Sequence, residues 1–248
     1  MMRRLLLSLF ALLGAPAIAL AQDNVLPDLS GVGSGDGDLS SPVNIVLVLT
    51  ALALAPAILM TVTAFTRIVI VLSFVRKALS VQDMPPNQVV IGLALFLTIV
   101  AMNPTLTEIY EQAAKPYMED EIGFAVASER ALDSLHVFMR QHTHEDEIEL
   151  FLELTETPPP ETPEQVPITV MIPAFALSEV KIAFKMGFLI YIPFLVVDIV
   201  IASILLAMGM FMLPPVIIST PFKILLFVMV DGWTLVIGSL MQSFQVPL

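Results

Sequence analysis

The stretch Met208–Pro221, MGMFMLPPVIISTP, decides how the rest of the chain must be organised. Long apolar runs flank it on both sides, so it is predicted to be the turn of a hydrophobic hairpin. Its glycine and three prolines exclude one continuous helix. Turns normally face water and are rich in polar residues, whereas this one is almost wholly apolar. Because non-helical backbone at membrane depth must be buried in protein or line a cavity, we expect a lining element.

The composition is typical of a membrane protein. Of the 248 residues, 57% are hydrophobic and 14% are charged, and the mean hydropathy is +0.89; in soluble domains about a quarter of the residues are charged. The net charge of -12 is concentrated in residues 105–170, which carry fifteen acidic and three basic side chains, and the rest of the chain is balanced. The sequence therefore offers no general attraction to nucleic acid. The absence of cysteine excludes disulfides and thiolate metal sites.

The N-terminal residues predict a leader. Residues 1–21 have a positive start, an apolar middle and a small-residue end, which is the pattern of a secretory signal peptide. The alternative is a retained first membrane helix. Residues 22–43 are rich in Gly, Ser and Asp and predict a flexible leader. Cleavage after residue 21 places the mature N-terminus outside the cytoplasm.

Residues 44–104 predict a first hydrophobic hairpin. The segment Ile45–Thr66 is uncharged and long enough to cross a bilayer. We expect a kink at Pro56 and a helix that continues to Lys77. Basic residues beside the following turn place that turn in the cytoplasm. The second apolar run, Val89–Met102, is short for a full span.

Residues 105–170 predict a small, acidic, helical domain outside the cytoplasm. Apolar periods at 132–139 and 148–154 indicate two helices with acidic outer faces. His142 and His144 lie beside acidic residues, as metal ligands can. Their spacing points them to different sides of a helix, so we expect a solvated acidic surface instead.

Residues 171–248 predict the second hydrophobic hairpin, which carries the methionine-rich turn. We expect a kink at Pro193. Thr220 as N-cap and Pro221 as first helical residue are expected to start a last helix that runs to about Phe244. Together the segments predict an all-α membrane protein in which two kinked hydrophobic hairpins flank the acidic domain.

Ionisable groups within apolar stretches form the first set of candidate site residues: Arg67, Asp198, Lys223 and Asp231. A charge at the bilayer centre costs on the order of 3 kcal/mol, so such groups pair or face a polar cavity. They either pair between helices or subunits, or line a conduit or couple to protons. Pairing is favoured because the two bases balance the two acids.

The apolar turn supplies the second set: Met208, Met210, Phe211 and Met212. Methionine often fills gaps in cores, which is the alternative. A turn position favours a deformable seal, because a ring of such loops from several subunits would exclude water and ions. The sequence holds no nucleophile–base pair, phosphate-binding loop or intramembrane zinc motif, so we expect neither an enzyme nor a bound cofactor or metal.

Several blocks of sequence resemble the FliP family, the flagellar type III export-gate proteins. The resemblance runs from about residue 45 to the end, and its blocks are Phe65–Phe74, Pro85–Thr98, Pro173–Phe188, Ile192–Ser203 and Pro221–Trp233. It implies a core subunit of the gate through which unfolded flagellar proteins leave the cytoplasm. It also implies a pentameric, ring-like helical assembly with FliR and FliQ, working with FlhB and FlhA. The location implied is the lipid of the bacterial inner membrane, at the flagellar basal body, with residues 105–170 periplasmic.

The resemblance gives the apolar turn a role as well. Family members carry a methionine-rich loop that closes the channel, and Met210, Phe211 and Met212 occupy the matching place. Two alternatives stay open. The first is the homologous gate subunit of a virulence injectisome, which the leader and the acidic insert disfavour. The second is an ion- or proton-coupled transporter that uses Asp198 or Asp231.

Overall fold

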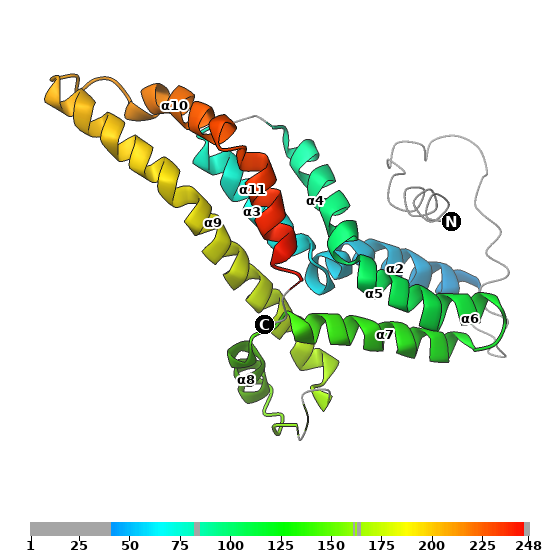
Figure 1. The fold of residues 1–248 in the computed structure, drawn as a ribbon. Coiled ribbons are helices and arrows are strands. Elements are labelled where there is room, and N and C mark those ends of the chain that lie inside the picture. Colours follow the sequence, from blue (N-terminus) through cyan, green and yellow to red (C-terminus); the bar gives the residue numbers. More distant parts are fainter. Residues whose placement is uncertain (1–40, 82–84, 161, 163–164, 246–248) are drawn as a thin grey trace, which may run out of the picture. The chain divides into compact units, whose positions relative to one another are not determined.

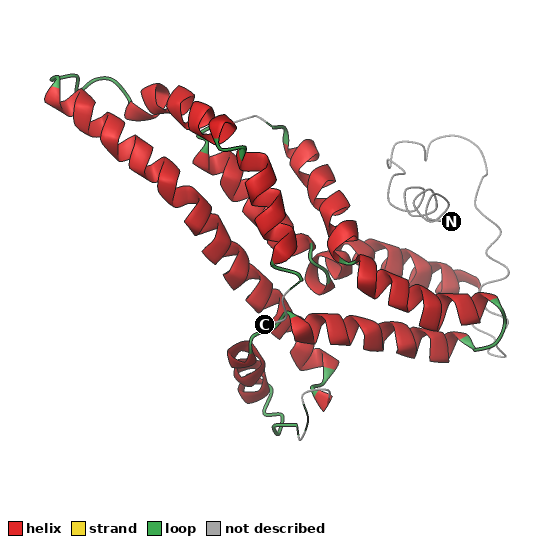
Figure 2. Ribbon diagram, in the orientation of Figure 1, coloured by secondary structure: helices red, strands yellow, loops and turns green. Residues whose placement is uncertain are grey.

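The computed structural model describes residues 41–81, 85–160, 162 and 165–245. The predicted signal peptide, residues 1–21, lies outside these residues. Of the predicted leader, residues 22–43, only the last three are described. The described chain is helical and contains no strand, which confirms the all-α class (Figure 2). Residues Met1–Leu49 and Thr50–Leu248 form two compact units. Of the first unit, the structure describes residues 41–49, which begin one helix.

The helices follow one another with these bounds: α2 Ser41–Val62, α3 Phe65–Ala78, α4 Asn87–Ala101, α5 Asn103–Ile109, the π-helical segment η2 Tyr110–Ala114, α6 Lys115–Met118, α7 Phe124–Gln141, α8 Glu145–Leu154, α9 Ile168–Ala207, α10 Pro215–Met229 and α11 Gly232–Gln242 (Figure 1). The segments α5, η2 and α6 form one arm of a helical hairpin, and α7 returns along them as the other arm. The two helices expected around 132–139 and 148–154 correspond to α7 and α8.

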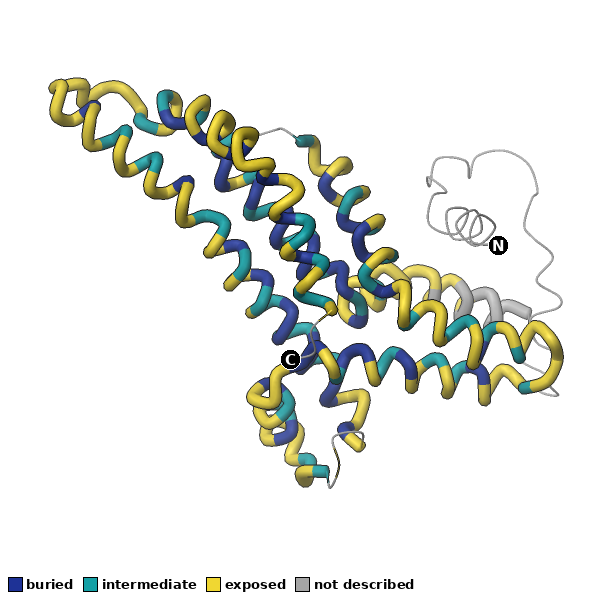
Figure 3. The backbone as a smooth tube through the Cα atoms, viewed as in Figure 1, coloured by how far each residue is buried: buried dark blue, intermediate teal, exposed yellow. Residues whose placement is uncertain are grey.

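Helix α3 lies at the centre of the core. It packs along α9 on one side and against α4 on another. The side chains of Ile68, Val71 and Val75 are completely buried, and their spacing of three and four residues places them on one face of the helix. In Figure 3 the buried residues gather along α3 and the neighbouring half of α9, whereas the loop that joins α9 to α10 is exposed.

The first predicted span does not continue as one helix to Lys77. Helix α2 passes through Pro56, and the chain bends instead after Val62, by 72° between Leu52–Val62 and α3. Threonine hydroxyls stabilise the break. Thr63 donates a hydrogen bond to the carbonyl of Leu59 (2.5 Å) and accepts one from the Phe65 N–H (3.3 Å). Because these side chains replace helical hydrogen bonds, the backbone can turn here without a proline.

The last predicted helix differs at its start and in its middle. Helix α10 begins at Pro215 rather than Pro221, because Pro214 is extended and Pro215 occupies the first helical position, where no N–H partner is needed. Pro221 lies inside the helix. The helix does not run on to Phe244: at Asp231 the backbone is left-handed, with φ 50°, and α11 leaves α10 at 64°.

Helix α9 is the one helix among the described residues that is long and apolar enough to cross a membrane by itself. Its 40 residues run without a break through Pro173 and Pro193, and at 1.5 Å per residue they extend over about 60 Å. Each of three bent helix pairs also passes the same test when its two halves are taken together. The division of the chain at residues 104 and 170 stays a prediction.

Close packing of α3 on α9 depends on Gly187. A Cβ atom built on Gly187 would lie 2.5 Å from ring atoms of Phe74, which also packs edge-on against Phe184. We therefore expect Gly187→Ala to lower the free energy of unfolding by about 1–3 kcal/mol, because overpacking forces the helices apart. Thermal unfolding in detergent measures the change.

Gly92→Ala is the matched control. Gly92 lies in α4, and a Cβ there meets nothing within 4 Å. Alanine has the higher helix propensity by up to about 1 kcal/mol, so this variant should be at least as stable as the wild type. Equal losses in the two variants would contradict the packing role of Gly187.

Candidate functional site

The loop Met208–Pro214 joins α9 to α10 and holds the four apolar candidates. Helix α9 ends in a Schellman motif: the N–H of Gly209 donates to the carbonyl of Leu206, and that of Met210 to the carbonyl of Leu205, both at 3.0 Å. Gly209 has φ 75°, a conformation that glycine adopts without steric cost. The motif therefore ends the helix at a defined residue and starts the loop in a fixed direction.

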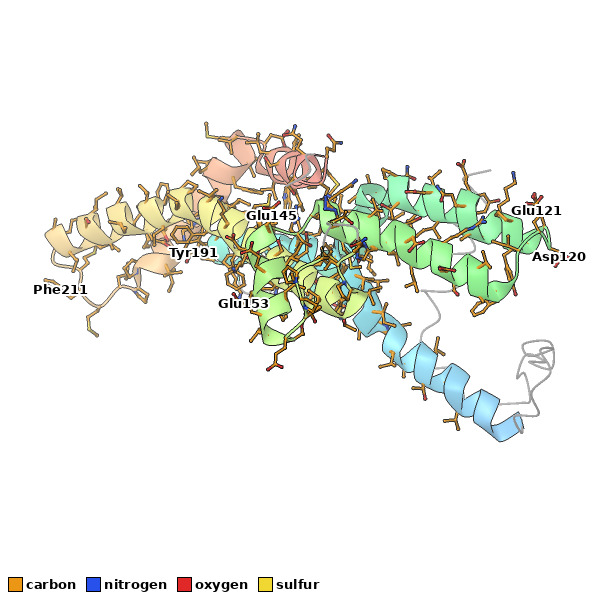
Figure 4. All side chains as sticks on the ribbon, turned by 90° about the horizontal axis from the view of Figure 1, so that it is seen from below. Asp120, Glu121, Glu145, Glu153, Tyr191 and Phe211 are labelled. Atoms are coloured by element: carbon orange, nitrogen blue, oxygen red, sulfur yellow. The ribbon has the colours of Figure 1, made fainter. Side chains whose placement is uncertain are left out.

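The side chains of this loop face outward. The exposed fraction is 66% for Met208 and 39% for Met210, and it rises to 77% for Phe211 and 96% for Met212. Figure 4 shows Phe211 at the end of the hairpin, away from the core helices. The structure thus brings the four predicted residues together in one exposed apolar loop. Such a loop needs lipid or a partner surface to cover it.

A buried ion pair joins α3 to α9. The guanidinium of Arg67 binds both carboxylate oxygens of Glu179: Nε donates to Oε2 at 2.9 Å, and Nη2 donates to Oε1. Both side chains are almost completely buried, with 1% and 0% exposed. The bidentate geometry matches the planar guanidinium to the planar carboxylate, which makes the pair strong and directional. The charge of Arg67 is therefore neutralised inside the chain.

The residues that follow α11 close over this pair. Arg67 Nη1 donates to the carbonyl and to the hydroxyl oxygen of Ser243, each at 3.0 Å. The guanidinium also lies over the ring of Phe244, with 4.0 Å between Arg67 Cζ and the ring centroid. One arginine thus holds α3, α9 and the end of the last helix together.

A second charged cluster lies further along α9. Lys223 Nζ donates to Asp198 Oδ2 at 2.6 Å and to the hydroxyl of Ser80 at 2.7 Å. The hydroxyl of Ser219 donates to the other carboxylate oxygen, Oδ1, at 2.5 Å. Lys223 is buried, and 22% of the Asp198 side chain is exposed. The cluster joins α9, α10 and Ser80, the second residue after α3.

The fourth ionisable candidate lies apart. Asp231 is exposed and stands at the break between α10 and α11. It makes no ion pair within the described part of the chain. We expected Arg67 and Lys223 to be balanced by Asp198 and Asp231. Lys223 does pair with Asp198, but Arg67 pairs with Glu179 rather than with Asp231.

Sequence reasoning missed Glu179, although a signal for it existed. Glu179 lies within the apolar helix α9, six residues before Lys185. Its position in an apolar stretch is the same signal that marks Asp198 as a candidate. Its partner was not predictable, since the two residues are 112 positions apart in the sequence.

The expected solvated acidic surface is confirmed at His144, Glu145 and Asp146, which are exposed, but it is wrong around His142. His142, Thr143 and Glu147 are buried. The ring of His142 packs against Phe138, with centroids 4.6 Å apart, and against Phe244 at 5.6 Å. The end of α7 therefore packs against the C-terminal residues, which sequence periodicity within 105–170 alone does not reveal.

Backbone carbonyls flank both nitrogens of the His142 ring. Nδ1 lies 2.8 Å from the carbonyl oxygen of Phe138, and Nε2 lies 3.2 Å from that of Phe244. Burial lowers the pKa of His142 below its ordinary value of 6.5, and the nearby charge of Arg67 acts in the same direction. The carbonyls oppose this shift but do not overcome it.

Removal of one partner from the Arg67–Glu179 pair should destabilise the protein strongly. Glu179→Gln leaves a buried guanidinium without a counter-charge, and we expect a loss of about 3–5 kcal/mol. The double variant Arg67→Met, Glu179→Leu removes both charges and should recover most of that loss. Denaturant unfolding of the purified proteins tests both expectations. A double variant at least as unstable as Glu179→Gln would contradict the role of the unpaired charge.

Acid should weaken the fold through His142. Because the folded state binds this proton less readily than the unfolded state, its contribution to stability is complete above pH 6.5 and declines as the pH falls below that value. His142→Gln removes the titrating group. We expect the difference in unfolding free energy between wild type and variant to shrink between pH 7.5 and 5. A difference independent of pH would contradict the assignment.

Comparison with known proteins gives a consistent result. The pattern described as the FliP family matches residues 48–240. The flagellar biosynthetic protein FliP of Bacillus subtilis is 53% identical over 207 residues, which cover 84% of this chain and 94% of the relative. The proteins of the same name are 50% identical in Pectobacterium carotovorum, over 82% of this chain and 78% of the relative, and 46% identical in Caulobacter vibrioides, over 93% and 85%. This chain therefore belongs to the FliP family.

Proposed function

We propose that this protein is a core subunit of the flagellar type III export gate, forming the channel through which unfolded flagellar proteins leave the cytoplasm. The observation that carries the proposal is the family match over residues 48–240, which includes the exposed apolar loop and both buried ion pairs. The relatives cited above are named flagellar biosynthetic proteins. Those names favour the flagellar system over the injectisome.

We propose that the loop Met208–Pro214 is the seal of the channel. Its side chains are apolar and project beyond the core, so copies from several subunits could meet on one axis. Packed together, they would exclude water and ions, as hydrophobic constrictions do. Methionine adapts its shape to a passing chain. Phe211 is stiffer, and it makes the patch larger and more apolar.

The charged residues brace the subunit on this proposal. Arg67 and Lys223 are both neutralised within the chain, by Glu179 and Asp198. A proton relay requires a carboxylate that is free to change its protonation, whereas Asp198 is bound by a lysine and by the hydroxyl of Ser219. At Asp198 this geometry favours bracing over proton coupling, whereas Asp231, which makes no ion pair within the described residues, is not covered by this argument. The export reaction needs no catalytic group, enzyme activity or cofactor from this chain.

The assembly on this proposal is a pentameric ring with FliR and FliQ, acting with FlhB and FlhA on unfolded flagellar substrates. Two kinked hydrophobic hairpins, residues 44–104 and 171–248, would face neighbouring subunits and the lipid of the inner membrane. The many exposed apolar side chains of α9 and α10 support this arrangement. Residues 105–170 would lie in the periplasm at the basal body, because the predicted signal peptide places the N-terminus outside the cytoplasm.

A deletion strain tests the proposed function, and loop variants test the seal. Cells without this protein should lack flagella, and the wild-type chain should restore them. Replacement of Met210, Phe211 and Met212 by alanine should raise the ion conductance of the membrane several-fold while flagella still form, because the constriction becomes wider and less apolar. Conductance of the complex in planar bilayers and motility of the cells are the two measurements.

Matched variants separate the seal from general damage. Phe211→Met keeps a large apolar side chain in the loop and should retain low conductance. Alanine at Leu150 and Leu154, exposed apolar residues of α8, should change neither measurement. Normal flagella in the deletion strain would overturn the function. Unchanged conductance in the triple alanine variant would overturn the seal alone.

A further inference from the structure

The turn between α6 and α7 has no role in the function proposed above. It is built as a second Schellman motif, in which the N–H of Asp120 donates to the carbonyl of Tyr117 at 3.2 Å and that of Glu121 to the carbonyl of Pro116 at 2.9 Å. Asp120 takes the left-handed conformation, φ 57°, that such a motif needs. The turn is therefore a defined structure that presents its side chains in fixed directions.

The side chains of this turn are of two kinds. Glu119, Asp120 and Glu121 are consecutive and exposed, and Figure 4 shows the last two at the far end of the helical hairpin. Beside them are exposed apolar residues, of which Met118 is 62% exposed and Phe124 is 72% exposed. We call the segment Tyr117–Phe124 the arm tip.

The apolar residues of the arm tip are not part of a local core. The rings of Tyr117 and Phe124 meet edge to face, with centroids 6.1 Å apart, and still leave Tyr117 46% exposed. The hairpin is closed instead below the tip, where Ala113 and Ala127 are buried. There Arg130 Nη1 donates to the carbonyl of Gln112, in the π-helical segment, at 3.1 Å. The arm thus holds the tip in place without covering it.

We propose that the arm tip is a docking site for a protein whose surface has an apolar socket with lysine or arginine residues around it. Tyr, Phe and Met are the residue types enriched in the cores of protein interfaces. Three adjacent carboxylates beside them would repel an acidic surface and attract a basic one. The arm itself, residues 103–141, carries seven acidic and three basic residues, so its field reinforces the charge of the tip.

The same charges argue against the other occupants. A second copy of this chain would bring the same carboxylates to the interface, and like charges in contact are costly. Anionic lipid headgroups would be repelled by Glu119, Asp120 and Glu121 in the same way. Glu108 and Glu111, further back along the same arm, add to the cost of inserting this hairpin into lipid.

Site-specific crosslinking in flagellated cells tests this proposal with the full chain. A photo-reactive phenylalanine at position 124 should form an adduct with one protein, at a peptide that contains Lys or Arg next to apolar residues. The variant Glu119→Gln, Asp120→Asn, Glu121→Gln keeps the side-chain shapes, and asparagine tolerates the left-handed conformation. It should lower the adduct yield on the order of tenfold, because the charge attraction is lost.

The matched control removes the same number of charges elsewhere. Glu149, Glu153 and Glu156 are exposed on and just after α8, and their replacement by Gln should leave the yield unchanged. A photo-reactive residue at position 154, exposed on α8, should not form the same adduct. Adducts with lipid only, with a second copy of this chain, or in equal yield from all variants would each overturn the proposal. The crosslink is read independently of export, so failure of the gate function would leave its result interpretable.

Discussion

The buried pair of Arg67 and Glu179 is the constraint on which the rest of the fold depends. A guanidinium in an apolar interior is tolerated only when its partner and all its donors are in place. Here the donors reach Glu179 on α9 and Ser243 after α11. Three segments far apart in the sequence must therefore assemble together. The cluster of Lys223, Asp198 and Ser80 imposes the same condition near the other end of α3.

Between these two charged clusters lies the apolar core, and beyond them lies the loop. Helix α3 runs parallel to α9. Its earlier residue Arg67 contacts Glu179, and its later residue Phe74 contacts Gly187, so the contacts follow the same order along both helices. After Asp198, α9 has no further charged residue, and its side chains up to Ala207 are mostly exposed. The chain thus fixes the base of the α9–α10 hairpin with directional bonds and leaves its apolar end free to meet other surfaces.

Hydropathy and residue type predicted the helical class, a turn that begins at Met208 and four ionisable residues in apolar stretches, because each depends on local sequence. The turn was expected to extend to Pro221, but the observed loop ends at Pro214. The break at Thr63 was not predictable in this way, since it rests on hydroxyl bonds rather than on a proline. The burial of His142 was missed for a different reason. It depends on Phe244, 102 residues away, and no periodicity within α7 contains that information.

Two of the buried basic side chains form ion pairs within this chain, so the proposed assembly does not have to supply counter-charges for them. Arg67 and Lys223 need no partner from a neighbouring subunit, because carboxylates of the same chain neutralise them. In the proposed assembly, neighbouring subunits and lipid would instead cover the apolar side chains that are exposed on α9 and α10. Asp231 is different, because it is exposed at a helix break without an ion pair within the described residues. Of the four ionisable candidates, it is therefore the one whose charge the surroundings of the subunit must accommodate.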